Sequence, residues 1–440
     1  MEIKTSPIDK VVYPVQNFMN QSKAGGIVLG IFVILALILA NSPWSTTYFE
    51  VLNYKTALYF DGKTYFNLSL LHWINDGLMA IFFFVVGLEL KREFVGGELS
   101  NPRKALLPIM AALGGMIVPA TIYLLLNPSG EAHSGWGIPM ATDIAFALGV
   151  LYLFGNKIPF SLKVFLTAFA IIDDLGAVIV IAFFYTSEIS LISLSVGLGF
   201  VLIMLLAAKL GVRNVWLYAI LGIGGVWVAF LLSGVHATIA AVLAAFAIPA
   251  DVKIKEAVFL KQIKKHLKQF ESIDPRDDIP NLTEEQVQIL SKVSEDVRNA
   301  VPPLQRLEHA MHPYVTFLIL PIFALANAGV SLVVQPDELF STNIAIGVAL
   351  GLIFGKIIGI TGTTFLLIKL KIASWPTGMN LKNLFGLSLL GAIGFTMSLF
   401  ITSLAFTHED FKTQAKIGIF VASLIAGISG YWVLNHSLKK

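Results

Sequence analysis

Residues 160–185 read FSLKVFLTAFAIIDDLGAVIVIAFFY, an apolar run in which Asp173 and Asp174 lie near the middle. A helix rises about 1.5 Å per residue, so this run can cross a hydrocarbon core about 30 Å thick. An ionisable side chain inside a span costs about 2.5–3.5 kcal/mol on insertion scales. A carboxylate pair facing the surface near a helix end is disfavoured, because apolar residues continue on both sides. The stretch therefore predicts a transmembrane helix that carries a functional site.

Similar apolar runs fill most of the 440 residues, of which 56% are hydrophobic and 13% are charged. A bilayer offers backbone groups no water, and the runs lack the period-two alternation of a barrel, so the spans are helical. The absence of cysteine excludes disulfides and thiolate sites. We predict an all-α polytopic membrane protein, a single transporter domain over residues 1–440, with twelve helices at 25–41, 71–90, 105–126, 137–154, 160–185, 191–208, 214–232, 234–249, 313–333, 343–366, 383–405 and 414–435.

The basic residues predict the orientation of these helices. If both termini are cytoplasmic, most Lys and Arg residues fall in inside loops, as the positive-inside rule requires. The outside loops then keep only Lys55, Lys63, Lys412 and Lys416. The first apolar run has no cleavage pattern and is interpreted as a retained span. A formal charge of +3 gives no indication of nucleic-acid binding.

Two segments are expected to lie outside the bilayer. Residues 45–70 form a periplasmic loop in which Asp61-Gly62 predicts a β-hairpin over 57–68. Its edge strands could pair with those of a second copy, so a homodimer is predicted. Residues 250–312 form a charged cytoplasmic loop, amphipathic at 254–270 and proline-bearing at 274–280. This loop is either partly helical or a mobile linker without a specific role.

A second carboxylate, Asp143, follows Pro139 and Thr142 inside an apolar run. Proline and an acid in mid-span predict an interrupted helix, which is tolerated where the freed backbone groups line a cavity or are buried in protein. A similar weak point lies at 391–398, in the sequence GAIGFTMS. Paired interruptions in two halves of a transporter indicate inverted repeats with a site near the midplane.

Lys356 is the one basic residue that falls in the interior of a predicted span, since Lys163 and Lys416 lie within four residues of a span end. It needs a counter-charge, which Asp173 or Asp174 could supply, because a buried pair avoids two isolated charges. Alternatively, Lys356 extends from a shorter helix to the interface. Burial favours the protonated form of a carboxylic acid, whereas a deprotonated carboxylate offers hard oxygen ligands to an alkali cation. Proton and cation would then compete for one site.

In its motifs, the chain resembles the NhaA family of bacterial sodium/proton antiporters. The likeness runs in order through 73–80 (WINDGLMA), 87–93 (GLELKRE), 141–146 (ATDIAF), 172–174 (IDD), 233–238 (SGVHAT), 307–313 (LEHAMHP) and 393–398 (IGFTMS). The resemblance implies an antiporter, not an enzyme, that exchanges sodium or lithium ions for protons across the inner membrane without a cofactor. It also implies pH-regulated, electrogenic exchange, with both termini inside and two broken helices that cross.

The resemblance also assigns roles to residues. Asp174 matches the main cation ligand, and Asp173 matches the aspartate linked to a buried lysine, here Lys356. Asp143, beside Thr142, matches the aspartate that balances the positive ends of the broken helices. The residues that match the family's pH-response positions are Glu89, Arg92, Glu93, His236, Glu308, His309 and His312. The 251–306 segment departs from the family in length and charge.

Three other functions are compatible with parts of the pattern. A sodium-coupled solute transporter would need a larger polar cavity than Thr142, Thr396 and Asn327 provide. An intramembrane aspartyl protease would need aspartates on separate helices. A passive channel would not need a carboxylate that alternates between proton and cation.

Overall fold

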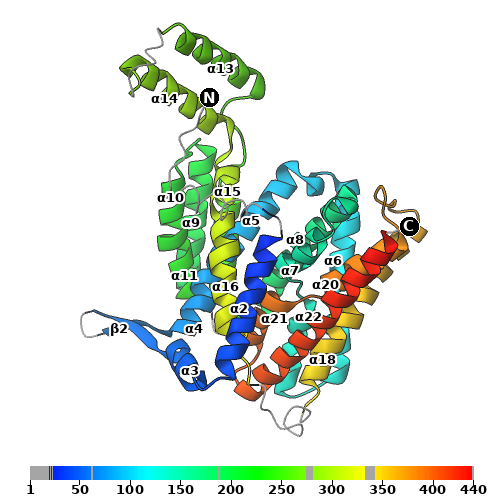
Figure 1. Ribbon diagram of the computed structural model, residues 1–440. Coiled ribbons are helices and arrows are strands. Elements are labelled where there is room, and N and C mark those ends of the chain that lie inside the picture. The colour runs from blue at the N-terminus through cyan, green and yellow to red at the C-terminus, as the bar shows by residue number, and fades with distance from the viewer. Residues whose placement is uncertain are drawn as a thin grey trace.

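A computed structural model describes residues 23–60, 63–186, 189–273, 281–331 and 342–438, together with Met19 and Gln21. In these ranges nearly all regular structure is helical, and the described strands form one two-stranded sheet. Figure 1 shows a bundle of inclined helices with a helical pair projecting at one end and a β-hairpin near the other. The predicted all-α class is therefore confirmed.

The elements of the bundle are, in chain order, α2 (Ala24–Ala40), α3 (Ser45–Asn53), α4 (Leu70–His72), η1 (Trp73–Leu78), α5 (Met79–Gly96), η2 (Glu98–Ser100), α6 (Pro102–Leu126), η3 (Glu131–Met140), α7 (Ile144–Tyr152), η4 (Gly155–Lys157), α8 (Phe160–Phe184), α9 (Leu191–Lys209), α10 (Val215–Ile220), η5 (Leu221–Trp227), α11 (Val228–Leu231), α12 (Ala237–Ala247), α15 (Pro303–Tyr314), η6 (Val315–Ile319), α16 (Leu320–Asn327), α18 (Ile344–Leu350), η7 (Gly351–Gly355), η8 (Ile357–Thr361), α19 (Gly362–Lys369), α20 (Leu381–Gly391), α21 (Phe395–Ala405) and α22 (Glu409–Ser437).

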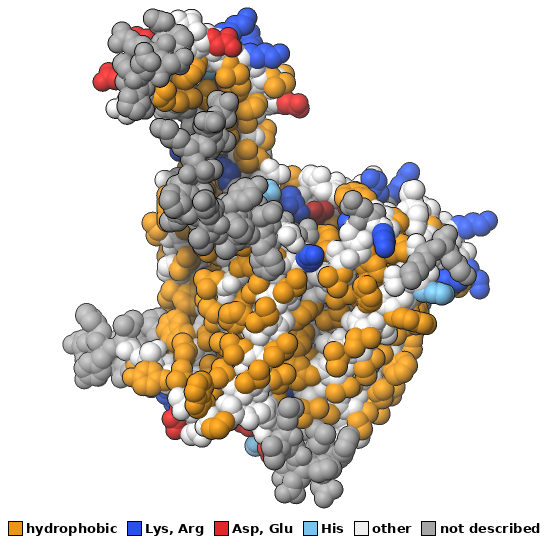
Figure 2. Space-filling view, viewed as in Figure 1, with side chains coloured by type: hydrophobic (Ala, Val, Ile, Leu, Met, Phe, Trp, Pro, Cys, Tyr) orange, Lys and Arg blue, Asp and Glu red, His pale blue; other side chains and the backbone are white. Residues whose placement is uncertain are grey.

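Length and apolarity identify the membrane-crossing helices. Among the described residues, 8 helices meet the requirement, and there are up to 10 spans if each of two bent helix pairs counts as one. The bent pairs are α2 with α3, at 110°, and α20 with α21, at 44°. Figure 2 shows hydrophobic side chains covering the sides of the bundle, with Lys and Arg gathered toward the end that carries the helical pair. This distribution is that of a multi-pass membrane protein.

Burial distinguishes the central helix from the peripheral ones. In α8, 67% of the most apolar stretch is buried inside the protein, compared with 11% in α9. Helix α8 packs on α6, α7, α5 and α20. Asp173 and Asp174 therefore lie at the centre of the bundle, because the helix that carries them is enclosed by other helices.

The two projecting elements have defined secondary structure. Strands β1 (Lys55–Phe60) and β2 (Lys63–Ser69) pair antiparallel, with Lys55 opposite Ser69. The Asp61-Gly62 turn predicted between them lies outside the described residues. The charged loop contains α13 (Glu256–Glu271) and α14 (Glu284–Ala300), and the side chains of Thr283 and Gln286 cap the start of α14. Residues 274–280 also lie outside the described part.

The ninth predicted helix begins earlier than the sequence pattern indicated. It was expected over 313–333, but α15 begins at Pro303 and continues through Pro313 into the π-helical turn η6. Proline lacks an N–H and disrupts the regular helical ladder, and a wider turn close to it accommodates the disruption. Helix α15 therefore starts within the segment 250–312 that is expected to form the charged loop, and it runs toward α13 and α14 (Figure 1).

Candidate functional site

Two interrupted segments meet beside α8. The first changes from the 3₁₀-helix η3 to α7 through the extended residues 141–143, and the second changes from α20 to α21 through 392–394. The Asp143 backbone N–H donates to Ile393 O at 2.6 Å, and Thr142 Oγ1 donates to Gly391 O at 2.7 Å. A Cβ on Gly394 would lie 3.0 Å from Ala141 O, so the two backbones are in close contact at this point.

Asp143 joins the starts of two helices. Its Oδ1 accepts the Phe146 N–H of α7 at 3.0 Å, and its Oδ2 accepts the Thr396 N–H of α21 at 2.8 Å. The Thr396 hydroxyl also donates to Oδ2. Helix N-termini carry unsatisfied N–H groups and partial positive charge, so one carboxylate stabilises both ends. With Asp143 1% exposed, this negative charge is balanced within the protein.

Lys356 reaches the aspartate pair on α8. Its Nζ donates to both carboxylate oxygens of Asp173, at 2.9 and 2.8 Å, and both residues are fully buried. The 5.5 Å distance from Nζ to the Phe169 ring centroid allows a cation–π contact. Lys356 therefore does not extend to the interface, and Thr142 also lies beside the Asp173 carboxylate.

Asp174 differs from its neighbour because neither carboxylate oxygen has a hydrogen-bond partner among the described residues. The side chain is 1% exposed, and Asp173, Asp143 and Glu89 lie close enough to act on it electrostatically. Lys356 already engages Asp173, so Asp174 is left as an unpaired buried carboxylate among negative charges. Such a group favours binding of a proton or a small cation.

The described residues contain no cluster of three His, Cys, Asp or Glu side chains arranged to hold a metal ion. The carboxylates of Asp143 and Asp173 have hydrogen-bond partners of their own. A hard cation at the Asp174 carboxylate would therefore take further oxygen ligands from hydroxyl, carbonyl or water groups. These ligands are compatible with a transiently held hard cation.

The pH-response candidates divide into separate groups. Arg92 of α5 donates from Nη1 to Glu308 of α15 and from Nη2 to Glu93 at 3.0 Å. Glu308 is 5% exposed, and its second oxygen has no partner in the described structure. This cluster connects α5 to α15, and Glu89 lies within electrostatic range of both Glu308 and Asp174.

The three histidines are not all part of this cluster. His309 and His312 lie on α15, and both are exposed. His236 precedes α12, where its Nε2 lies 2.9 Å from Tyr185 O. Lys91 of α5 binds carbonyl oxygens at the opposite end of α12, including Ile248 O. His236 is therefore separated from the Arg92 cluster by the length of α12.

Two features of the bundle were not predicted from the sequence. Asn327 Nδ2 donates to Asn75 Oδ1 at 2.8 Å between two buried side chains. Lys356 is flanked by the π-helical turns η7 and η8. Single amides in apolar runs were a weak signal for the first feature. Helical periodicity cannot reveal the second, because π-turns are short and have no distinct composition.

The chain is similar to known proteins over nearly its whole length. Residues 16–434 match the family described as Na⁺/H⁺ antiporter 1. The chain is 47% identical over 433 residues to the Na⁺/H⁺ antiporter NhaA of Oleidesulfovibrio alaskensis, covering 98% of this chain and 96% of the relative. It is 47% identical over 429 residues to NhaA 2 of Syntrophotalea carbinolica, covering 96% of each. The NhaA 1 antiporter of Clostridium beijerinckii is 45% identical over 424 residues, covering 96% of this chain and 95% of the relative.

Proposed function

This chain belongs to the Na⁺/H⁺ antiporter 1 family, and we propose that it exchanges sodium or lithium ions for protons, with Asp174 holding the two in turn. The observation that carries the proposal is the unpaired state of the buried Asp174 carboxylate. A protonated Asp174 is neutral and therefore has no negative charge with which to bind a cation. A deprotonated Asp174 provides two oxygens for a cation in a region where Asp173 and Asp143 add negative charge.

Asp173 and Lys356 form the second part of the proposed mechanism. A sodium ion drawn toward Asp173 as well as Asp174 competes with Lys356 for the Asp173 oxygens. Lys356 then loses its counter-charge in a buried environment, which favours release of its proton. One proton from Asp174 and one from Lys356 per sodium ion would move net charge. This provides a physical route to electrogenic exchange.

Asp143 and Thr142 are proposed to fix the electrostatics of the site. The Asp143 carboxylate compensates two helix N-termini, so the crossing contributes no uncompensated positive charge that would repel a cation. Thr142 connects this crossing to Asp173 through its contact with that carboxylate. The pair therefore positions the α8 site without itself binding the ion.

We also propose the membrane arrangement that this mechanism needs. The two shorter apolar helices, Val215–Leu231 and Ala237–Ala247, would add to the long spans and bent pairs to give twelve crossings in the bacterial inner membrane. Both termini would be cytoplasmic, the β-hairpin would be periplasmic, and α13 with α14 would be cytoplasmic. The two interrupted segments would be the crossed broken helices of an inverted repeat.

The Arg92 cluster is the proposed pH-response element. It connects α5, which carries Glu89, to α15 through Glu308. Protonation of a carboxylate in this cluster would weaken the link between the two helices. Such a change would alter the population of active protein, so it would lower the maximal rate at acid pH even when sodium is saturating.

The alternative functions have less support. Asp173 is held by Lys356, so the adjacent aspartates do not form a pair that could share a catalytic water. The site consists of carboxylates, Lys356 and threonine hydroxyls, which offers no set of groups for an organic solute. A passive channel would leave the unpaired state of Asp174 without a role.

The test is transport by Asp174→Asn in sealed vesicles. An amide cannot exchange a proton for a cation, so sodium should no longer collapse a preformed pH gradient. Asp410→Asn, which changes an exposed aspartate on α22, is the matched control and should transport normally. Near-normal exchange by Asp174→Asn would overturn the proposal.

A further inference from the structure

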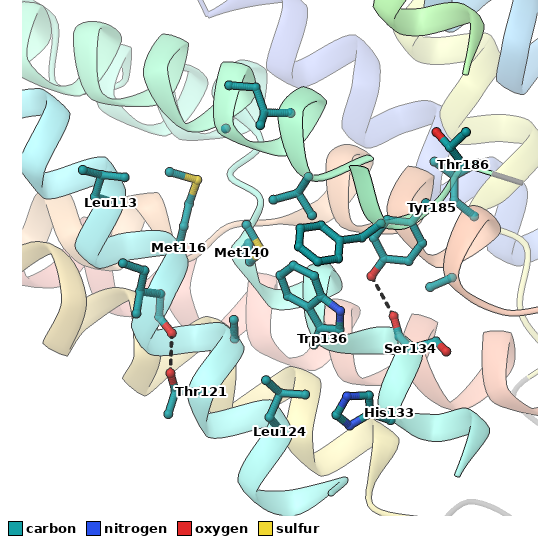
Figure 3. Close-up of a pocket in the computed structure, with 18 residues that line it drawn as sticks. Leu113, Met116, Thr121, Leu124, His133, Ser134, Trp136, Met140, Tyr185 and Thr186 are labelled. Atoms are coloured by element: carbon teal, nitrogen blue, oxygen red, sulfur yellow. Dashed lines mark hydrogen bonds between the residues drawn. The ribbon is translucent and has the colours of Figure 1, made fainter. Parts of the chain in front are cut away.

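A cavity of about 1020 Å³ lies between α6, η3, α8 and the end of α21. Figure 3 shows Trp136 at its centre, with Met116 and Met140 on one side and Tyr185 on the other. The cavity lies beside the C-terminal half of α6, from Leu113 onward. None of the site residues Asp143, Asp173, Asp174 or Lys356 lines it.

The rim of this cavity faces the hydrocarbon rather than the protein interior. Leu113 and Ile117 on α6 are 39% and 61% exposed, and Ile179 and Phe184 on α8 are 47% and 66% exposed. Large apolar side chains at these exposures on membrane-crossing helices contact lipid. The cavity is therefore a recess in the lipid-facing surface between α6 and α8.

Three polar side chains on the wall, those of Thr121, Thr186 and Tyr185, are already engaged by the backbone, whereas His133 and Ser134 are exposed where η3 begins. Thr121 Oγ1 donates to Ile117 O at 2.7 Å, and Thr186 Oγ1 donates to Ala182 O at 2.6 Å. Tyr185 Oη donates to Ser134 O at 2.6 Å, as Figure 3 shows. A hydrated ion would require free polar groups in place of its water. An apolar occupant requires none.

The inner end of the cavity is closed by a close contact between two helices. A Cβ on Gly176 of α8 would lie only 2.2 Å from Met116 Sδ of α6, so the thioether rests on the glycine. Gly176 follows Asp174 on the same helix by less than one turn. An occupant at the inner end would thus touch the part of α8 that carries the carboxylates without reaching them.

We propose that this recess binds an acyl chain of a membrane phospholipid and is not a water-filled route to Asp174. The chain fills the space beside Trp136 and ends against Met116, where it fixes the spacing of α6 and α8. This inference rests on membrane insertion alone. It holds whether or not the protein exchanges sodium for protons.

Fluorescence of Trp136 provides the test. The chain has 7 tryptophans, so one variant keeps Trp136 alone and a control keeps only Trp432, which is 68% exposed on α22. The other tryptophans are replaced by phenylalanine. Each variant is placed in phosphatidylcholine vesicles with or without bromine atoms at mid-chain, and quenching by bromine is compared with quenching by aqueous iodide.

We expect the bromolipid to quench Trp136 and iodide to leave it unchanged. Ala120→Leu and Ala405→Leu, which fill the recess from α6 and α21, should each reduce this quenching. The same substitutions should not change bromolipid quenching of Trp432. Quenching of Trp136 by iodide would show a water-filled vestibule and overturn the proposal. Bromolipid quenching that neither filling substitution reduces would overturn it as well, because the chain would then lie outside the recess.

Discussion

Replacing Lys356 with alanine tests the central ion pair of the bundle. Lys356 donates to both oxygens of Asp173, and neither residue is exposed to solvent. The substitution leaves a buried carboxylate without its partner, a change that costs about 3–5 kcal/mol in proteins. We therefore expect Lys356→Ala to lower the free energy of unfolding by about this amount. Reversible unfolding in mixed detergent micelles, followed by circular dichroism, measures it.

A second substitution separates the lost charge partner from lost packing. Adding Asp173→Asn to Lys356→Ala removes the orphaned charge, so the double variant should be more stable than Lys356→Ala alone. Lys369→Ala is the matched control, because Lys369 lies on the same membrane segment but is exposed. It should change stability by less than about 0.5 kcal/mol. Equal stability of Lys356→Ala and Lys369→Ala would show that the ion pair does not stabilise the bundle. A double variant less stable than Lys356→Ala alone would show the same.

Three further predictions concern other contacts of the fold. Arg92→Ala should lower the free energy of unfolding by about 1–3 kcal/mol, because it leaves the Glu308 carboxylate buried without its donor. Arg103→Ala, at an exposed position, should not lower it, and equal free energies for the two variants in chemical unfolding would contradict this prediction. Gly355→Ala should lower the free energy of unfolding by about 1–3 kcal/mol, because its Cβ would lie 2.5 Å from Pro119 Cα. A Cβ at Gly362 meets nothing within 4 Å, so equal melting temperatures for Gly355→Ala and Gly362→Ala would refute the close packing. Deletion of residues 58–68 should raise the monomer fraction in detergent and leave residual transport, and an unchanged dimer fraction would count against pairing through the hairpin.

The all-α fold class and the burial of the two α8 aspartates could be predicted from the sequence. A carboxylate pair in a long apolar run requires a buried helix, because no other structure satisfies the backbone inside a bilayer. The same cost argument required a partner for Lys356, and the structure places Asp173 there. Both inferences combine the composition, which is read directly from the sequence, with the energetic cost of placing a charge in a bilayer.

Other features depend on how helices pack, and composition and hydropathy alone could not predict them; only the family resemblance assigned Asp173 as the partner of Lys356. Nothing in the local sequence distinguishes Asp173, which is paired, from Asp174, which is not. Helix geometry places the two about 100° apart, and only the position of the helix carrying Lys356 decides which one it meets. The start of α15 at Pro303 was also missed, because Pro313 resembled a helix boundary and the π-turn that accommodates it has no sequence pattern.

Competition between protons and sodium at Asp174 is the central step of the proposed mechanism. Sodium-driven proton movement should be measured in vesicles over a series of sodium concentrations at several pH values. We expect the sodium KM to rise as pH falls, because protonated Asp174 excludes the cation, and high sodium should restore most of the rate. Some loss of maximal rate at the acid end would reflect the Arg92 cluster. A sodium KM that stays constant across the activating pH range would contradict the mechanism.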